Sequence, residues 1–374
     1  MHIGVLGAGQ LGRMLALAGY PLGFRFTFVD PNPSSPAAQL APHLIANYDD
    51  PQALEQLGKT DVVTYEFENV PEAAAVALAG HVPIYPNPVA LRIAQDRLFE
   101  KTRFQRLDIT TSPFVSISNE EDLESALQKL GTPCLLKTRR LGYDGKGQQR
   151  IVKSEDGGRA FEALGRVPCL LEQWITFSRE LSLLCARSTS GELAFYPLVQ
   201  NVHHEGILRM TLAPAPGLTE ALQQLAQQYA ERLLRDLDYV GVLAIEFFDV
   251  GGQLLANEFA PRVHNSGHFT IEGAVTSQFE NHLRAITNFP LGDTSIRGSV
   301  AMLNLVGAMP NPVDVLVIKD AHLHDYGKEP RAGRKLGHIT LVARNETERA
   351  ERLAAIEPAL VSCGALPRDV ILNA

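Results

Sequence analysis

The first part of the chain alternates short apolar runs with helical segments, and this alternation constrains the fold more than any other feature. Residues 3–6 form an apolar run, residues 7–12 a glycine-rich turn, residues 13–18 a helical segment and residues 24–29 a second apolar run. A further unit ends in residues 61–66. Strands and helices in this order are typical of a parallel sheet covered by helices on both faces. We therefore predict an α/β fold.

The length of 374 residues suffices for two or three domains. We predict one helix over residues 90–107 and place the first boundary near residue 95. A shift in composition over residues 288–297 indicates the second boundary. The predicted domains are residues 1–95, 96–295 and 296–374.

The overall charge bears on the class of partner. The chain has 34 Lys and Arg against 42 Asp and Glu, a formal net charge of −8. A protein that binds nucleic acid without sequence preference needs a basic surface, so we expect no nucleic-acid partner. No run approaches the ~20 apolar residues of a membrane span, and the N-terminus has no basic leader. We expect a cytoplasmic protein without a membrane partner.

The first glycine turn matches a dinucleotide-binding pattern. Gly7, Gly9 and Gly12 have GxGxxG spacing between a strand and a helix, and Asp30 follows 18 residues later at a strand end. Such glycines let the backbone approach any phosphate near a helix N-terminus. Taken alone, the turn leaves three interpretations open: a nicotinamide dinucleotide site, a site for another phosphate, or a structural turn.

A second glycine-rich loop covers residues 139–148 and lies between two predicted strands. Lys137 ends the first of these strands, and the loop combines three glycines with three cationic side chains. A Walker loop would need a helix directly after it, so this loop is of another kind. We predict that it closes over phosphates and excludes water. The alternative is an ordinary surface hairpin.

Two acids lie in neighbouring apolar strands joined by the Gly251-Gly252 turn. Counted outwards from this turn, Glu246 and Glu258 lie opposite each other or miss by one residue. Facing carboxylates repel unless a cation lies between them, and Mg²⁺ selects carboxylate and phosphate oxygens. The pair predicts a metal site, against the alternative of a surface charge pair. Glu172 ends another apolar strand, and Glu180 follows eight residues later. We predict that these two acids contact a nucleotide.

Several motifs together resemble one enzyme family. They are residues 9–14 (GQLGRM), 96–98 (DRL), 142–148 (GYDGKGQ), 196–198 (YPL), 257–268 (NEFAPRVHNSGH) and 333–338 (GRKLGH). On these motifs the chain resembles the ATP-grasp superfamily and, within it, the PurK-type N5-carboxyaminoimidazole ribonucleotide synthetases. The resemblance covers nearly the whole chain. It implies a Rossmann-like N-terminal domain, a central ATP-grasp domain and a small C-terminal domain.

The resemblance also implies a reaction. ATP and bicarbonate would carboxylate 5-aminoimidazole ribonucleotide through carboxyphosphate, in purine synthesis, with Mg²⁺ (or Mn²⁺) as the cofactor and a homodimer as the assembly. The alternatives are another ATP-grasp carboxylate–amine ligase, a nicotinamide-dependent dehydrogenase based on the first glycine turn, and a non-catalytic nucleotide-binding module.

The resemblance assigns site residues position by position, and the first glycine turn becomes a wall of the ribonucleotide pocket. The implied ATP contacts are Arg97, Lys137, Gly142, Tyr143, Asp144, Gly145, Lys146, Gly147, Gln148, Glu172, Gln173, Trp174, Ile175, Glu180, His203, Asn257 and Glu258. The implied ribonucleotide contacts are Gln10, Leu11, Tyr143, Asp144, Arg262, His264, Asn265, Lys328, Arg331, Arg334 and Lys335. The implied catalytic residues are Asp144, Arg262, His264 and Lys328, and the metal ligands are Glu246 and Glu258.

Overall fold

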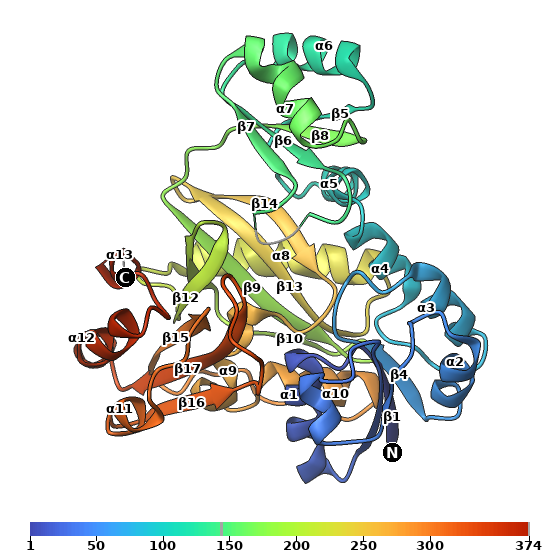
Figure 1. Ribbon diagram of the computed structural model, residues 1–374, viewed down its shortest axis with the longest axis vertical. Helices are drawn as coiled ribbons and strands as arrows, with labels where there is room; N and C mark the ends of the chain where they lie inside the picture. Colours follow the sequence, from blue (N-terminus) through green and yellow to red (C-terminus); the bar gives the residue numbers. More distant parts are fainter. Residues whose placement is uncertain (143–144, 373–374) are drawn as a thin grey trace.

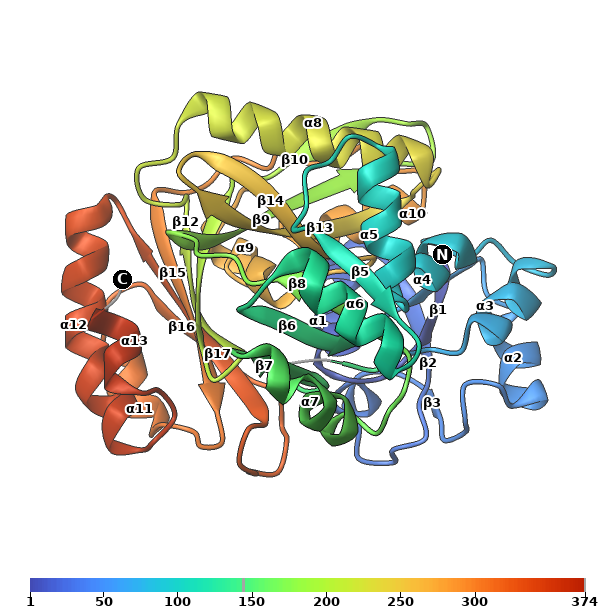
Figure 2. The same ribbon diagram turned by 90° about the horizontal axis from the view of Figure 1, so that it is seen from above.

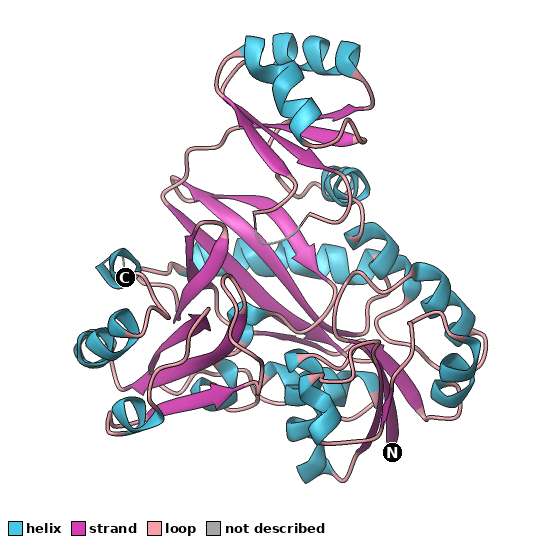
Figure 3. Ribbon diagram, viewed as in Figure 1, coloured by secondary structure: helices cyan, strands magenta, loops and turns pink. Residues whose placement is uncertain are grey.

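The strands of the molecule form three sheets (Figures 1 and 2). A computed structural model describes residues 1–142 and 145–372, so Tyr143 and Asp144 lie outside the described residues. Figure 3 shows helices packed against all three sheets. No helix within the described ranges is long and apolar enough to cross a membrane.

The N-terminal sheet is parallel, with strand order β3-β2-β1-β4. Its elements are β1 (His2–Leu6), α1 (Gln10–Gly19), β2 (Arg25–Val29), β3 (His43–Leu44), α2 (Pro51–Leu57), β4 (Val62–Tyr65) and α3 (Glu72–Ala79). Apolar side chains of α1 pack on one face of the sheet, and those of α2 and α3 pack on the other. The predicted α/β fold with a covered parallel sheet is confirmed.

The single helix predicted over residues 90–107 is wrong. Two helices occupy this stretch, α4 (Pro88–Ala94) and α5 (Arg97–Arg106). Asp96 between them has an extended backbone, and its carboxylate accepts the backbone N–H of Leu98 at 3.0 Å. A side-chain acceptor at this position caps the second helix and ends the continuous helical pattern. Arg139 also donates to Asp96, at 2.7 Å, so the break is held from outside the helix.

A small antiparallel sheet stands above the rest of the molecule in Figure 1, with order β5-β8-β6-β7. Its elements are β5 (Phe114–Ile117), α6 (Glu120–Leu130), β6 (Cys134–Thr138), β7 (Gln148–Ile151), α7 (Gly157–Ala163) and β8 (Cys169–Gln173). Because β6 pairs with β7, the second glycine loop connects two strands, as predicted.

The largest sheet has nine strands in the order β14-β13-β9-β11-β12-β15-β17-β16, with β10 beside β9. Its strands are β9 (Arg179–Arg187), β10 (Leu193–Phe195), β11 (Val199–His204), β12 (Ile207–Ala213), β13 (Gly241–Val250), β14 (Gln253–Ala260), β15 (Ser299–Val306), β16 (Ala321–Asp325) and β17 (Lys335–Ala343). Its helices are α8 (Glu220–Asp236), α9 (Thr270–Gly273), α10 (Gln278–Ile286), α11 (Pro312–Leu316), α12 (Glu346–Ser362) and α13 (Arg368–Leu372). The pairing of β12 with β15 makes the sheet continuous across the predicted boundary at residue 296.

Candidate active site

A cavity of about 680 Å³ lies where the three sheets meet. Its wall combines the first glycine turn, the small sheet with its glycine loop, and the β13–β14 hairpin of the large sheet. Of the residues assigned from sequence, the wall contains Gln10, Leu11, Arg97, Lys137, Gly142, Gly145, Lys146, Gln148, Glu172, Gln173, Trp174, Ile175, Glu180, His203, Glu246, Asn257, Glu258, Arg262, His264, Asn265 and Lys335. Side chains that are far apart in sequence therefore share one cavity.

Four assigned residues with described coordinates lie outside this wall: Gly147, Lys328, Arg331 and Arg334. Lys328 nevertheless contacts the wall, since its Nζ donates to Oε1 of Gln10. Arg334 donates to the carbonyl oxygen of Glu329 at 3.1 Å. The role of these four residues stays a prediction.

The two hairpin acids face each other across the sheet. β13 and β14 pair in register around the Gly251-Gly252 turn, and Glu246 lies opposite Glu258. A regular register from the turn would place Asn257 opposite Glu246, but a bulge between Glu246 and Phe247 shifts the pairing by one residue. The bulge brings both carboxylates to the same face of the sheet, because successive side chains alternate between faces.

The electrostatics of this pair suit a cation. Burial, with the neighbouring Glu258 carboxylate, raises the pKa of Glu246 to about 7. Burial would also raise the pKa of Glu258, but the Arg97 guanidinium, 2.9 Å away, holds it below its ordinary value. Among the described residues, the buried Oδ1 of Asn257 has no hydrogen-bond partner. Two carboxylates and one amide oxygen are hard donors of the kind that Mg²⁺ takes.

These oxygens do not form a complete metal cage. No group of three or more His, Cys, Asp or Glu within the described ranges is arranged to hold a metal ion. Mg²⁺ commonly takes one or two carboxylates and completes its octahedron with phosphate oxygens and water. The residues present therefore fit a magnesium ion that arrives with a nucleotide.

A buried charge cluster lies next to the hairpin. Glu172 contacts Lys137 at 3.2 Å and Lys101 at 3.4 Å, and it accepts from the Ser112 hydroxyl at 2.8 Å. Burial opposes its charge, yet the two lysines and Ser112 lower the pKa of Glu172 to about 2. Its carboxylate therefore binds the two lysines in the interior; Glu172 also lines the cavity, and its nucleotide contact stays a prediction. Lys101 was missed because its place in α5 shows no pattern other than that of a solvated helix.

The segment after β8 and the β13–β14 hairpin form an apolar end of the cavity. Trp174 and Ile175 line it together with Leu208 and Phe248. Phe248 stacks on Phe177 with ring centroids 4.6 Å apart. At its edge, Nδ1 of His203 lies 3.1 Å from Glu180, and although burial lowers its affinity for protons, this carboxylate raises the pKa of His203. A planar base with a polar sugar attached fits such a surface.

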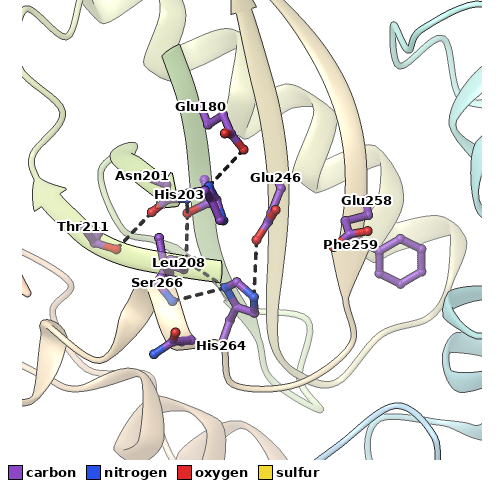
Figure 4. Close-up of polar contacts among 12 residues, drawn as sticks. Glu180, Asn201, His203, Leu208, Thr211, Glu246, Glu258, Phe259, His264 and Ser266 are labelled. Carbon is purple, nitrogen blue, oxygen red and sulfur yellow. Dashed lines mark hydrogen bonds and ion pairs between the residues drawn. The ribbon is translucent and has the colours of Figure 1, made fainter. Parts of the chain in front are cut away.

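A basic end of the cavity follows the hairpin in sequence. Arg262 donates to the carboxylate of Glu68, a residue the sequence analysis missed, and this contact fixes its guanidinium. Asn265 and Asn304 exchange hydrogen bonds at 2.9 and 2.7 Å. His264 lies between Ser266 and Glu246 (Figure 4). Burial, with the Arg262 charge, lowers the pKa of His264 to about 3.

The first glycine turn does not present free donors to a dinucleotide. The Glu66 carboxylate accepts the backbone N–H groups of Gly9 and of Gly12, the latter at 2.6 Å. These are the donors that a pyrophosphate would use in a dinucleotide site. A Cβ on Gly7 would lie only 2.3 Å from Cγ of Glu66, so the turn is built around this carboxylate. The position of Glu66 after strand β4, at the carboxyl edge of the parallel sheet, was the available signal for its role.

Comparison with known families assigns each part of the chain. The ribonucleotide synthetase preATP-grasp domain matches residues 1–95, and the ATP-grasp domain matches residues 102–279. The phosphoribosylaminoimidazole carboxylase C-terminal domain matches residues 300–352. The ATP-grasp match includes the small sheet and strands β9–β14 of the large sheet, and the C-terminal match includes strands β15, β16 and β17 of the same large sheet.

Individual relatives extend over nearly the whole chain. The N5-carboxyaminoimidazole ribonucleotide synthase of Pseudomonas aeruginosa is 51% identical over 358 residues, which are 96% of this chain and 99% of the relative. The crystal structure of the corresponding synthetase from Thermus thermophilus has a TM-score of 0.94 at 53% identity and covers 98% of this chain and 99% of that one. The synthase of Aspergillus clavatus, solved with ADP and 5-aminoimidazole ribonucleotide, has a TM-score of 0.89 at 32% identity and covers 100% and 99%.

Proposed function

The chain belongs to the N5-carboxyaminoimidazole ribonucleotide synthase family of ATP-grasp ligases, and we propose that it carboxylates 5-aminoimidazole ribonucleotide with ATP and bicarbonate. The reaction yields N5-carboxyaminoimidazole ribonucleotide, ADP and phosphate in purine biosynthesis. The observation that carries this proposal is the cavity itself. It joins a facing carboxylate pair and the cationic side chains of Arg97 and Lys137 to a wall from the first glycine turn.

The metal-binding part of the proposal rests on the hairpin. Glu246, Glu258 and Asn257 would hold Mg²⁺, or Mn²⁺ in its place, since their oxygens line one face of the cavity. When bound, the cation neutralises charge that develops on the transferring phosphoryl group. Arg97 and Lys137 lie beside this face and would bind the phosphates of ATP, while the loop of residues 142–148 would cover them.

The chemistry has three steps. A bicarbonate oxygen attacks the γ-phosphorus of ATP, the bond to the β-phosphate oxygen breaks, and ADP leaves. The resulting carboxyphosphate splits into CO₂ and phosphate. The exocyclic amine of the ribonucleotide then attacks the CO₂ carbon and loses one proton. Carboxyphosphate hydrolyses readily, so a cavity closed to water preserves it.

The residues at the basic end have the charge and position for this transfer. Arg262, fixed by Glu68, would bind the anionic oxygens of bicarbonate and carboxyphosphate. His264 and Asn265 line the same cavity and would contact the substrates beside Arg262. Lys328, which contacts Gln10, would bind the ribonucleotide together with Arg331, Arg334 and Lys335. The roles predicted for Tyr143 and Asp144 concern residues outside the described ranges.

Phosphate release tests the proposal. The purified chain is incubated with ATP and Mg²⁺, and bicarbonate and 5-aminoimidazole ribonucleotide are added separately and together. We expect rapid release only when both are present, with ¹³C-bicarbonate carbon appearing in a carbamate. Release that required formate in place of bicarbonate would support another carboxylate–amine ligase. Oxidation of a reduced nicotinamide without Mg²⁺ would support a dehydrogenase, and ATP binding without any turnover would support a binding module.

Two further expectations concern the assembly and the location of the protein. We propose a homodimer as the assembly and the cytoplasm as the location. Sedimentation of the purified chain at micromolar concentration tests the first, with a single species of twice the 40.9 kDa chain mass as the expected result.

A further inference from the structure

A buried chain of polar side chains leads away from His264 across the large sheet. Nδ1 of His264 lies 2.9 Å from the Ser266 hydroxyl, and Ser182 donates to that hydroxyl at 2.8 Å. Asn201 donates to Ser182 at 3.0 Å, and Thr211 donates to Asn201 at 3.0 Å. All four partners of the chain are at least 95% buried. Figure 4 shows His264 at one end, between Ser266 and Glu246.

The fold builds this chain from four separate elements. Thr211 lies on β12, Asn201 on β11 and Ser182 on β9, and Asn201 is the register partner of Thr211. Ser182 is the register partner of Glu246 on β13, so both side chains point to the face that carries the cavity. Ser266 comes from the short helix η4 (Asn265–Gly267), which directly follows His264. The network therefore connects the sheet to the catalytic wall without using an exposed residue.

The hydrogen bonds have a defined direction at His264. The backbone N–H of Ser266 points at Nδ1 from 3.3 Å, and an amide N–H can only donate. Nδ1 must therefore offer a lone pair. The side-chain hydrogen bonds give the same direction. Ser182 accepts from Asn201, so its own hydroxyl proton is donated to Ser266. Ser266 in turn has its proton left for Nδ1. An imidazole that accepts at Nδ1 carries its proton on Nε2.

The protonated nitrogen faces the reaction cavity. Nε2 of His264 lies 3.4 Å from Oε1 of Glu246, longer than an ordinary hydrogen bond, and both residues line the cavity. A general base at this position would need a lone pair on Nε2 and a proton on Nδ1. That proton would then face the Ser266 N–H.

We propose that Ser266, supported by Ser182, Asn201 and Thr211, is a positioning residue that fixes the Nε2–H tautomer of His264. His264 then donates a hydrogen bond to an anionic oxygen of bicarbonate or carboxyphosphate and does not act as a base at Nε2. The identity of that oxygen rests on the proposed function. The tautomer itself does not, since it follows from contacts within the chain.

Nitrogen NMR of the ligand-free protein tests the tautomer directly. Protein with ¹⁵N-labelled histidine gives separate long-range ¹H–¹⁵N patterns for the two tautomers, and the His264→Gln variant identifies the signals of His264. We expect the pattern with a protonated Nε2 and an unprotonated Nδ1. A protonated Nδ1 in this spectrum would overturn the proposal, whatever reaction the enzyme performs.

Kinetics of network variants test the effect on the reaction. Ser266→Ala removes the hydroxyl contact at 2.9 Å and keeps only the longer backbone N–H contact at 3.3 Å. It should lower kcat roughly tenfold, leave the KM for ATP unchanged and populate both tautomers in the NMR spectrum. Ser182→Ala and Thr211→Val, further along the chain, should give progressively smaller losses. Ser188→Ala is the matched control, because this serine is 1% exposed and bonds only outside the network. A loss in the control equal to that in Ser266→Ala would mean that the effect is structural.

Substitution of His264 itself distinguishes a hydrogen-bond donor from a general base at Nε2. Gln places an N–H donor near the position of Nε2 but cannot accept a proton at pH 7. We expect His264→Gln to retain at least ten times the kcat of His264→Ala. Equal activity of the two variants, with a normal tautomer signal in the wild-type protein, would refute the donor role. If no variant or wild-type protein turned over the ribonucleotide, the proposed function would fail, but the NMR result would stand.

Discussion

At the scale of residues, the site depends on buried charged side chains that are paired with buried side chains of opposite charge. Lys101 is 1% exposed, and its Nζ donates to Thr111 at 2.9 Å and to the carbonyl oxygen of Ala256 at 3.2 Å, besides contacting Glu172. It therefore anchors α5 to β14, the strand that carries Glu258. The sequence indicated Lys137 and Glu172, since both end apolar strands. It could not indicate Lys101, because the burial of a helical lysine depends on which strands later cover it.

Removing this lysine should destabilise the fold. Lys101→Met keeps the length of the side chain but leaves Glu172 with Lys137 alone, and breaking a buried ion pair costs about 3–5 kcal/mol. We expect a loss in the free energy of unfolding within this range, measured by urea denaturation. Lys59→Met is the control, because its pair with Glu55 is exposed to solvent and should contribute little to stability. Equal losses would contradict the structural role of Lys101.

At the scale of elements, the β13–β14 hairpin shows where sequence reasoning stops. The Gly251-Gly252 turn predicted the pairing of the two strands to within one residue, because strand register follows from turn geometry. The bulge at Asn257 shifts the register by one residue, so that Glu246 lies opposite Glu258. Its neighbour Ala256 accepts from Lys101 and donates its N–H to Thr110 at 2.7 Å. Such contacts with a segment about 150 residues earlier leave no local pattern in the sequence.

Helix α10 makes a second junction, between the N-terminal and large sheets, and His282 lies in it. Nδ1 of His282 accepts from the Val242 backbone at 3.1 Å, and Nε2 lies 2.9 Å from the Thr64 hydroxyl. Burial lowers the pKa of His282 to about 3. In the unfolded chain, His282 takes up a proton below its ordinary pKa of about 6.5, whereas in the folded chain the buried imidazole stays neutral at this pH. The stabilisation is thus complete above pH 6.5 and is lost as the pH falls.

This histidine predicts part of the acid sensitivity of the fold. Between pH 7 and pH 5 it should remove about 2 kcal/mol of unfolding free energy. His282→Gln, whose amide can both accept and donate, should show a pH-dependent loss smaller by this amount, and His81→Gln at an exposed position should behave like wild type. Urea denaturation at the two pH values measures the difference. Identical losses in all three proteins would contradict the assignment.

At the scale of the whole molecule, the cavity exists only because three sheets meet. The alternation at the N-terminus predicted the first sheet, and the resemblance supplied the order of the rest. The continuity of the large sheet through β12 and β15 was not visible, because antiparallel partners about 90 residues apart share no local periodicity. The charged segment after β4, with Glu66 and Glu68, was missed although its place at the carboxyl edge of the parallel sheet was a signal. Their function comes from the elements that they face.

The small sheet and its glycine loop should respond to nucleotide. We predict that ATP with Mg²⁺ slows tryptic cleavage after Arg140 and Lys146, since phosphate binding would hold residues 139–148 against the cavity. Cleavage sites at exposed arginines elsewhere, such as Arg159, should be cut at an unchanged rate. Mass spectrometry of the early fragments gives both rates. Equal rates at all sites with and without nucleotide would contradict closure of the loop.

The most direct test of the account is divalent-cation binding at the β13–β14 hairpin. Free Mn²⁺ is measured by electron paramagnetic resonance during titration of the protein with ADP present, for wild type, Glu246→Gln and Glu258→Gln. We predict a site in the wild-type protein whose affinity falls at least roughly tenfold in each variant, because each loses a charged ligand. The exposed control Glu55→Gln should bind as wild type does. Undiminished Mn²⁺ binding in both hairpin variants would contradict the account.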